Sequence, residues 1–287
     1  NKMIRGSLAN DGGNYFLTLE EKNELIKKEP KSLKWIRKAI GSEEFLKGKQ
    51  RWCLWLNEIS QDELREMPSV EKRVENVRNL RLSSKKEATR KLAETPQRFD
   101  EIKQPKNGNY IVVPRVTSER RRYIPLDFLS HEIICTDRNQ MIPNGTMYEF
   151  GILNSIMHNE WMRLVTGRLE SRYNYSGTIV YNTFPFPTVT DEQKKHIEHL
   201  AEEILLTRED FAGDTLAKLY DPDTMPESLK IAHQNLDDAV DKLYNPKGFA
   251  DTASRLAHLL ERYESLINTE KQQVIDKKAK KMKTKKE

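Results

Sequence analysis

The stretch GNYIVVPRVTSERRRYIPL, residues 108–126, determines the fold of the central part of the chain. Its β-branched run Tyr110–Val116 predicts one strand, and Arg122–Leu126 predicts a second strand after the polar connection Thr117–Arg121. Tight polar connections of this kind expose their side chains at the edge of a sheet. The stretch therefore predicts a small β-rich domain that carries arginines on a surface loop.

The same alternation of strands and polar connections continues to residue 188. Further strands are expected at His131–Thr136 and Thr178–Phe184, and apolar residues at helical spacing predict an amphipathic helix over Met147–Thr166. Polar connections are expected at Asp137–Gln140 and Leu169–Ser176. Residues 108–188 thus form the expected recognition core, with a helix inserted behind the sheet.

Every basic residue of this core is an arginine, although the whole chain has 29 lysines and 20 arginines. Arginine offers a planar fork that can donate two hydrogen bonds to guanine or to a phosphate, whereas lysine offers a mobile point charge. The core also holds seven acids, so internal salt bridges are the alternative explanation. The arginines are Arg115, Arg120, Arg121, Arg122, Arg138, Arg163, Arg168 and Arg172, and their possible acidic partners are Glu119, Glu149, Glu160 and Glu170.

The segment before the core, residues 1–60, predicts a turn and strand over Asp11–Leu17, helices at Leu19–Lys28 and Pro30–Ile40, and a buried strand within Phe45–Ile59. Because the chain starts at Asn1 and not at methionine, it is expected to be a piece of a longer polypeptide. Residues 68–94 are dense in charge and predict one long helix. The arginines and lysines of this helix, Arg81 among them, either follow a DNA backbone or are simply solvated.

After residue 188 the sequence predicts only helices. Three apolar stripes at helical spacing, broken by proline-rich turns, predict packed helix hairpins over residues 189–287. From Glu270 to Glu287 there are eight lysines and three acids, which supply the net charge of +5. We expect this tail to be a frayed and solvated end, with loose attraction to phosphates as the alternative.

Composition excludes several classes of protein. With 37% hydrophobic and 32% charged residues, the chain can bury a core. The two cysteines, Cys53 and Cys135, are too few for a disulfide framework and are expected to be buried thiols. No apolar run is long enough to span a membrane and no signal-peptide pattern is present, so a cytoplasmic location is expected.

Several short strings of this sequence are specific when they are taken together. They are RWCLWL at 51–56, VPRV at 113–116, SERRRYIP at 118–125, LESRYNYS at 169–176, VYNTFPFP at 180–187, YDP at 220–222 and MP at 225–226. With these strings the chain resembles the C-terminal part of MmeI-like type IIG restriction-modification enzymes, and the resemblance covers almost the whole chain. In that family one polypeptide joins a nuclease, an adenine-N6 methyltransferase, a target-recognition domain and a C-terminal helical segment.

The resemblance implies an α+β target-recognition domain over residues 1–188 and an all-helical domain over residues 189–287. It implies double-stranded DNA as a partner, together with the N-terminal methyltransferase domain of the same polypeptide. S-adenosylmethionine, and Mg²⁺ for a nuclease, would belong to that parent protein. A protein-interaction or structural module without base readout is the competing class.

Catalytic motifs are missing from the sequence, so this chain is expected neither to methylate nor to cut DNA. An amino-methyltransferase of this kind needs an Asn/Asp-Pro-Pro-Tyr/Phe loop to hold the flipped adenine, and the strings at Asp221–Asp223 and Asn245–Gly248 lack it. The Glu-x-Lys pairs at Glu20 and Glu192 have no Pro-Asp partner. The six histidines are scattered, so neither a metal site nor a catalytic triad is expected.

Two sets of contact residues are expected within the recognition core, with a register that can shift by one or two positions. The alternative for Glu119 and Arg172 is a surface ion pair. Base edges are assigned to Glu119, Arg120, Asn139, Gln140, Ser171, Arg172 and Asn174, and phosphates to Arg115, Arg121, Tyr173 and Tyr175.

Overall fold

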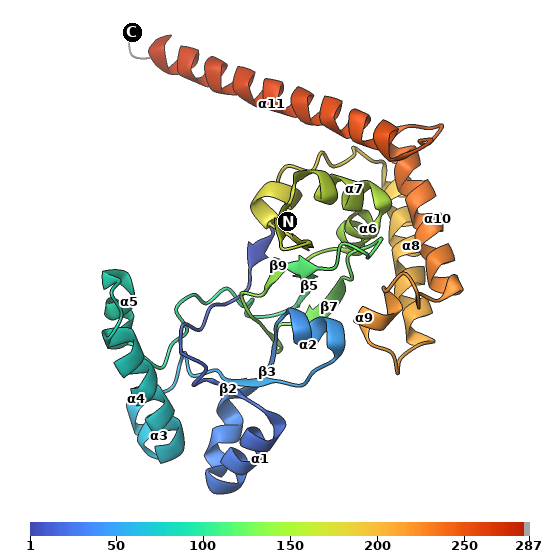
Figure 1. Cartoon of the computed structure of the whole chain (residues 1–287). Helices are drawn as coiled ribbons and strands as arrows, with labels where there is room; N and C mark the ends of the chain where they lie inside the picture. Colours follow the sequence, from blue (N-terminus) through green and yellow to red (C-terminus); the bar gives the residue numbers. More distant parts are fainter. Residues whose placement is uncertain (284–287) are drawn as a thin grey trace.

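A computed structural model describes the backbone of residues 1–283 and the side chains of residues 1–269, 271 and 272. Three small sheets and their helices form the first two thirds of the described chain, and only helices follow (Figure 1). The predicted α+β class, with a helical C-terminal part, is confirmed. The prediction for most of the lysine tail lies outside the described side chains.

The central sheet has the order β1-β9-β5-β7, and all its pairs are antiparallel. Its strands are β1 (Ile4–Arg5), β5 (Asn109–Pro114), β7 (Asp127–Ser130) and β9 (Asn139–Pro143). The expected first strand is therefore present as β5. The second strand starts at Asp127 and not at Arg122. Tyr123, Ile124 and Leu126 all turn inward instead of alternating, and the Ile124 N–H donates to Asn159 Oδ1 rather than to a ladder.

The predicted helix Met147–Thr166 is two helices, α6 (Met147–Asn154) and α7 (Ile156–Val165). Ser155 ends the first, and its hydroxyl caps the second by accepting from the His158 N–H. The expected strand Thr178–Phe184 is also wrong, because Gly177–Tyr181 forms a π-helical turn whose carbonyl at Val180 accepts from the Trp161 indole. That bond packs the turn on α7.

The second sheet has the order β2-β4-β3-β8 and brings the N-terminal segment against the recognition core. Its strands are β2 (Phe16–Leu17), β3 (Ile36–Ile40), β4 (Trp52–Leu54) and β8 (Ile134–Cys135). The strands β3 and β8 are parallel, whereas the other pairs are antiparallel. Both cysteines are buried and free.

Two predictions for the N-terminal segment are wrong, while the helix Leu19–Lys28 (α1) is confirmed. Residues Pro30–Ile40 form a short 3-10 helix and then β3, because the pairing of Ile36–Lys38 with β4 replaces helical hydrogen bonds. Of the expected strand Phe45–Ile59, only Trp52–Leu54 (β4) forms a strand. The first residues of that expected strand belong to α2 (Ser42–Lys47), which buries Phe45 and Leu46 and ends at Gly48 with φ 65°.

The expected long helix over residues 68–94 is interrupted. It consists of α4 (Pro68–Leu82), α5 (Glu87–Lys91) and a 3-10 turn, with α3 (Gln61–Arg65) before it. The cause is Arg81, whose side chain is 1% exposed and donates to the carbonyls of Leu92 and Thr95. The chain after α4 thus folds back onto α4, and the Arg81 guanidinium is buried among backbone carbonyls, so it is not solvated and is not free to bind a phosphate.

A third sheet of short strands, β10 (Gly167–Leu169), β11 (Arg172–Asn174) and β6 (Val116–Thr117), extends from the end of β5. The first two strands form an antiparallel hairpin. The sequence Leu169–Ser176, expected to be a loop, is therefore the turn and second strand of this hairpin.

The C-terminal helices are α8 (Asp191–Glu209), α9 (Leu216–Leu219), α10 (Glu227–Tyr244) and α11 (Thr252–Lys283). The three predicted helical stripes lie on α8, α10 and α11. Helices α8 and α10 run side by side, whereas α11 contacts α7 and then extends away from the body (Figure 1). None of the helices in the described part of the chain combines the length and apolarity needed to cross a membrane.

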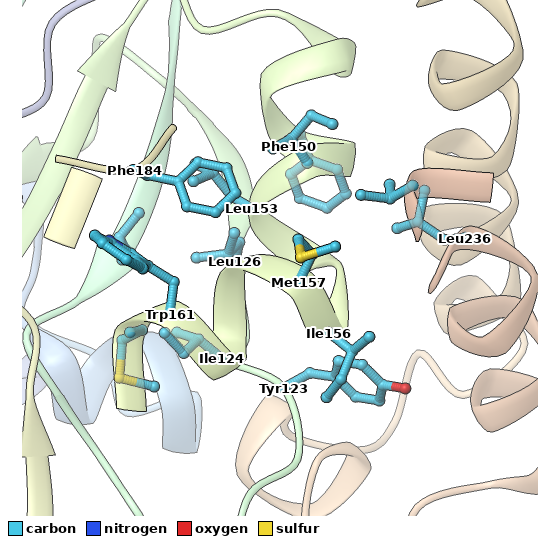
Figure 2. Close-up of a cluster of buried hydrophobic side chains, with 14 of the residues drawn as sticks. Tyr123, Ile124, Leu126, Phe150, Leu153, Ile156, Met157, Trp161, Phe184 and Leu236 are labelled. Atoms are coloured by element: carbon cyan, nitrogen blue, oxygen red, sulfur yellow. The ribbon is translucent and has the colours of Figure 1, made fainter. Parts of the chain in front are cut away.

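One hydrophobic core joins the helical part to the recognition core. Figure 2 shows Leu236 of α10 beside Phe150 and Met157 of the α6–α7 pair, and all three are fully buried. The packing is tight at Gly151, where α8 approaches so near that an added Cβ would lie 2.8 Å from Ile197. The helices therefore brace the sheet directly.

Candidate nucleic-acid interface

Three polar segments meet where β5 ends and β9 begins. The Arg115 N–H donates to the Arg138 carbonyl at 3.2 Å, and Arg115 Nη1 donates to the Asp137 carbonyl at 3.0 Å. The Tyr175 N–H, just after β11, donates to the Arg115 carbonyl at 2.7 Å. Backbone bonds thus place Arg115, Arg138 and the hairpin on one edge, which we call the recognition edge.

The β10–β11 hairpin projects from this edge with its tip in solvent. Residues 167–172 are all exposed, and Leu169 keeps 48% of its surface accessible. Glu170 adopts a left-handed φ of 57° at the turn, and its carboxylate lies 2.6 Å from Arg172 Nη2. Such an ion pair between exposed groups contributes little stability, about 0–1 kcal/mol. Arg172 is therefore held in place only weakly.

The loop Ser118–Arg122 also faces solvent, but the helical part holds it from behind. Arg120 Nη2 lies 2.5 Å from Asp223 Oδ2, in the turn before α10, and Arg163 of α7 donates to the Arg121 carbonyl. Burial lowers the pKa of Arg121, whose Nη1 reaches the Thr117 hydroxyl at 3.3 Å. The loop thus has a fixed base and exposed side chains at Glu119 and Arg120.

Four of the expected contact residues are buried, so their side chains do not reach this surface. Asn139 has no exposed surface, because its amide donates to the Ile40 carbonyl and accepts from Ser42. The Tyr175 hydroxyl is buried against His158 Nε2 at 3.0 Å, and burial raises the pKa of Tyr175. The side chains of Gln140 and Tyr173 are 8% and 6% exposed. The expectation failed because Asn139 begins β9 and does not lie in a loop.

Arg138 and Arg168 are not among the expected contact residues, and both are exposed beside the remaining candidates. None of the described side chains pairs with Arg138, whereas Arg168 lies over the Tyr173 ring at 4.3 Å. Both belong to residues 108–188, where arginine is used in place of lysine, and this pattern could have identified them. Arg138 was not assigned because Asp137–Gln140 was expected to form a loop, in which Asn139 and Gln140 would be as accessible as Arg138.

No catalytic constellation accompanies this edge in the described part of the chain. No group of three or more His, Cys, Asp or Glu side chains there could hold a metal ion. Burial lowers the pKa of His158 and of His233 to about 3, so both rings are neutral at physiological pH. Their Nε2 atoms are occupied by tyrosine hydroxyls, as at His233 and Tyr220.

An α+β body with an exposed hairpin and arginine loop, braced by helices, is the organisation of a target-recognition domain joined to a helical domain. Residues 1–188 match the family described as "MmeI, target recognition domain", and residues 189–270 match "MmeI, C-terminal domain". The chain therefore belongs to the MmeI family, and the resemblance seen in its sequence is confirmed.

Two relatives show the extent of the match. DNA methyltransferase A of Bacillus subtilis (strain 168) is 40% identical over 265 residues, which are 92% of this chain and 30% of that protein. The solved structure of the type IIL restriction-modification enzyme MmeI in complex with DNA matches with a TM-score of 0.91 and 43% identity, over 93% of this chain and 36% of that one. The chain thus spans about a third of the length of these relatives.

Proposed function

We propose that the chain is the sequence-specific recognition part of a type IIG-like restriction-modification enzyme or adenine-N6 DNA methyltransferase. The observation that carries this proposal is the exposed β10–β11 hairpin beside an arginine loop, on a chain of the MmeI family. A two-stranded ribbon fits the major groove of B-DNA, where each base pair presents a distinct set of donors and acceptors. The relative solved with DNA supports the same ligand.

The contact residues that we retain are those on the recognition edge whose side chains are exposed or partly exposed, the partly exposed ones being Arg115, Arg121 and Asn174. Glu119, Arg120, Ser171, Arg172 and Asn174 face the base edges, and Arg115 and Arg121 lie nearer to the phosphates. The exposed Arg138 and Arg168 join this surface. The phosphate contacts would fix the register of the chain on the duplex, while the hairpin and the loop would read the sequence.

The chemistry would then belong to other parts of the same polypeptide. We propose that an N-terminal methyltransferase domain supplies the S-adenosylmethionine site, and that Mg²⁺ serves a nuclease where one is present. The whole enzyme would act in the cytoplasm. The present chain places that catalytic domain on its target and neither methylates nor cuts DNA alone.

A structural module is the second candidate, and specific ion pairs favour it. Arg120 pairs with Asp223, Arg163 with Glu160, and Arg172 with Glu170. In that case these arginines would be neutralised by the protein itself. The pairs of Arg120 and Arg172 are exposed, however, so exchanging a carboxylate for a phosphate or a guanine edge costs little.

A titration separates the two candidates. The purified chain is mixed with duplex DNA of random sequence at several salt concentrations, and a groove binder must lose affinity steeply as salt rises. Affinity that is absent at low salt would contradict the DNA-recognition proposal and support the structural module. Methyl transfer from S-adenosylmethionine to any duplex by the same preparation would contradict the claim that the chain has no catalytic activity.

A further inference from the structure

A groove of about 1160 Å³ lies beside the second sheet, away from the recognition edge. It is bordered by the start of β3, the turn after β4, residues 98–106 and the turn before β8. Trp35 and Trp55 form part of its wall, and both indole rings are half-exposed. We call this space the flanking groove.

Four cations line the flanking groove, and none has an acidic partner within the described part of the chain. Only Glu58 and Glu132 bring negative charge to the lining. Lysines nearby behave differently, since Lys31 pairs with Glu66 and Lys34 with Glu63. The unpaired cations are Arg37, Lys38, Arg98 and Lys106, all exposed. Four like charges around one groove repel each other, which favours binding of an extended anion.

The walls of the flanking groove are fixed by hydrogen bonds. Gln104 donates to the carbonyls of His131 and Ile133 at 2.7 and 2.9 Å, and its own carbonyl accepts from the Cys135 N–H at 2.9 Å. Arg37 Nη1 donates to two backbone carbonyls, at 2.9 and 3.1 Å, which restrains the guanidinium. Trp55 packs edge-on against Phe99 at 4.8 Å. The groove is therefore present before any ligand binds.

The parallel strands β3 and β8 connect the flanking groove to the recognition edge. The groove lies at their amino ends, and their carboxyl ends lead to Ser42, whose hydroxyl donates to the Arg138 carbonyl at 2.6 Å. Five strand residues span roughly 15 Å at 3.3 Å per residue. At 3.4 Å per base pair, that length corresponds to about four or five base pairs.

We propose that the flanking groove binds the sugar–phosphate backbone of duplex DNA a few base pairs outside the recognised sequence. This inference rests on the proposed function, because it assumes that the recognition edge holds a duplex. The four cations would contact successive phosphates, and the two indole rings would pack on deoxyribose. Contacts of this kind add affinity and set the position along the duplex, but they carry no sequence information.

The double substitution Lys38→Gln and Arg98→Gln tests the groove. The dissociation constant is measured on a random-sequence duplex of about 30 base pairs, three helical turns, over a range of salt. Removing one phosphate-binding cation should lower the slope of log affinity against log salt by about 0.9, so the double variant should have a slope smaller by about 1.8. The weakening should be equal on duplexes of unrelated sequence.

The matched control is Lys195→Gln with Lys247→Gln, two exposed lysines of the helical part. It removes the same charge outside the groove, and its salt slope should match that of the unsubstituted chain. Thermal melting should be unchanged in both double variants, because all four side chains are exposed. A slope that falls equally in the control would overturn the groove proposal, since net charge alone would then explain the effect.

The same titrations separate the two proposals. An unsubstituted chain that does not bind the duplex at any salt concentration refutes the proposed function. Normal binding by the unsubstituted chain, with an unchanged salt slope in the Lys38/Arg98 variant, refutes the flanking groove alone.

Discussion

The phenol of Tyr123 donates a 2.7 Å hydrogen bond to Oδ2 of Asp237, and this bond joins the arginine loop to α10. The other carboxylate oxygen accepts from the Ile156 N–H at 2.6 Å, at the start of α7. The Tyr123 ring also stacks on His233, with centroids 4.1 Å apart. One buried carboxylate of the helical part thus positions the residue that follows the loop Ser118–Arg122.

The first prediction concerns pH. Burial raises the pKa of Asp237 from 3.8 to about 7, so the folded state binds a proton that the unfolded state releases. The contribution of Asp237 to the free energy of unfolding is fully present below pH 3.8, its ordinary pKa. This contribution is lost as pH rises toward 7, and the free energy of unfolding falls by up to about 1.4 kcal/mol per pH unit. Asp237→Asn removes this titration, so its unfolding free energy should decline less over that window.

Urea unfolding of both proteins between pH 4.5 and 8 measures the difference. The buried His158 and His233, whose pKa values are lowered to about 3, act in the opposite direction below pH 6.5, but they are present in both proteins and cancel. A stability difference between Asp237→Asn and the unsubstituted chain that stays constant with pH would contradict the prediction.

A second prediction follows from the buried guanidinium of Arg81. It donates to six backbone carbonyls, including those of Ala9 and Arg98, and no described carboxylate pairs with it. Arg81→Gln leaves most of these acceptors unsatisfied, at about 1–3 kcal/mol for each buried group. We expect a loss of at least about 3 kcal/mol in urea unfolding. Arg78→Gln, an exposed change on the same helix, should stay within about 0.5 kcal/mol.

Arg81 also shows what the sequence could and could not predict. Local periodicity correctly placed α8, α10 and α11, and the apolar stripes of α8 and α10 each bury one face. The break after α4 depends on hydrogen bonds between Arg81 and residues near 9 and 95, far apart in sequence. No local pattern reports such contacts, so the charged run predicts one continuous helix.

The sequence indicated which types of residue lie at the recognition edge, but not which of their positions are exposed. The selection of arginine over lysine drew attention to Arg172 and Arg120, which are both exposed, and their contact with DNA stays a prediction. The assignment of Asn139 and Gln140 failed because polar side chains look the same in a loop and in a buried strand. Only the pairing of β9 with β5 shows that Asn139 is directed toward Ile40.

A third prediction tests the contact between the recognition core and the helices. An added methyl group at Gly151 would lie 2.8 Å from Ile197 Cγ2 and 3.2 Å from Ala201 Cβ, so α8 must move away from α6. Gly151→Ala should destabilise the chain by about 1–3 kcal/mol through overpacking. Gly213→Ala meets no atom within 4 Å and serves as the control. Equal melting temperatures for the two variants would mean that α6 and α8 do not share a tight core.

The last prediction separates base readout from phosphate attraction. If Arg172 donates both of its fork hydrogens to a guanine, Arg172→Ala in the full-length parent should cost about 1–3 kcal/mol on the cognate sequence and relax preference at one base pair. Removing Lys277–Lys286 should instead weaken all duplexes equally and flatten the salt dependence, because counterion release depends on charge and not on sequence.

A panel of duplexes that differ from the cognate sequence by one base pair each makes this comparison. Among the described side chains, Arg172 has only Glu170 as an ion-pair partner, at 2.6 Å on an exposed turn, so its removal should leave the melting temperature nearly unchanged. A readout residue therefore shows weakened binding at one position with normal stability. An even decrease across the panel would make Arg172 a phosphate contact, and a lowered melting temperature would make it a structural residue of the hairpin.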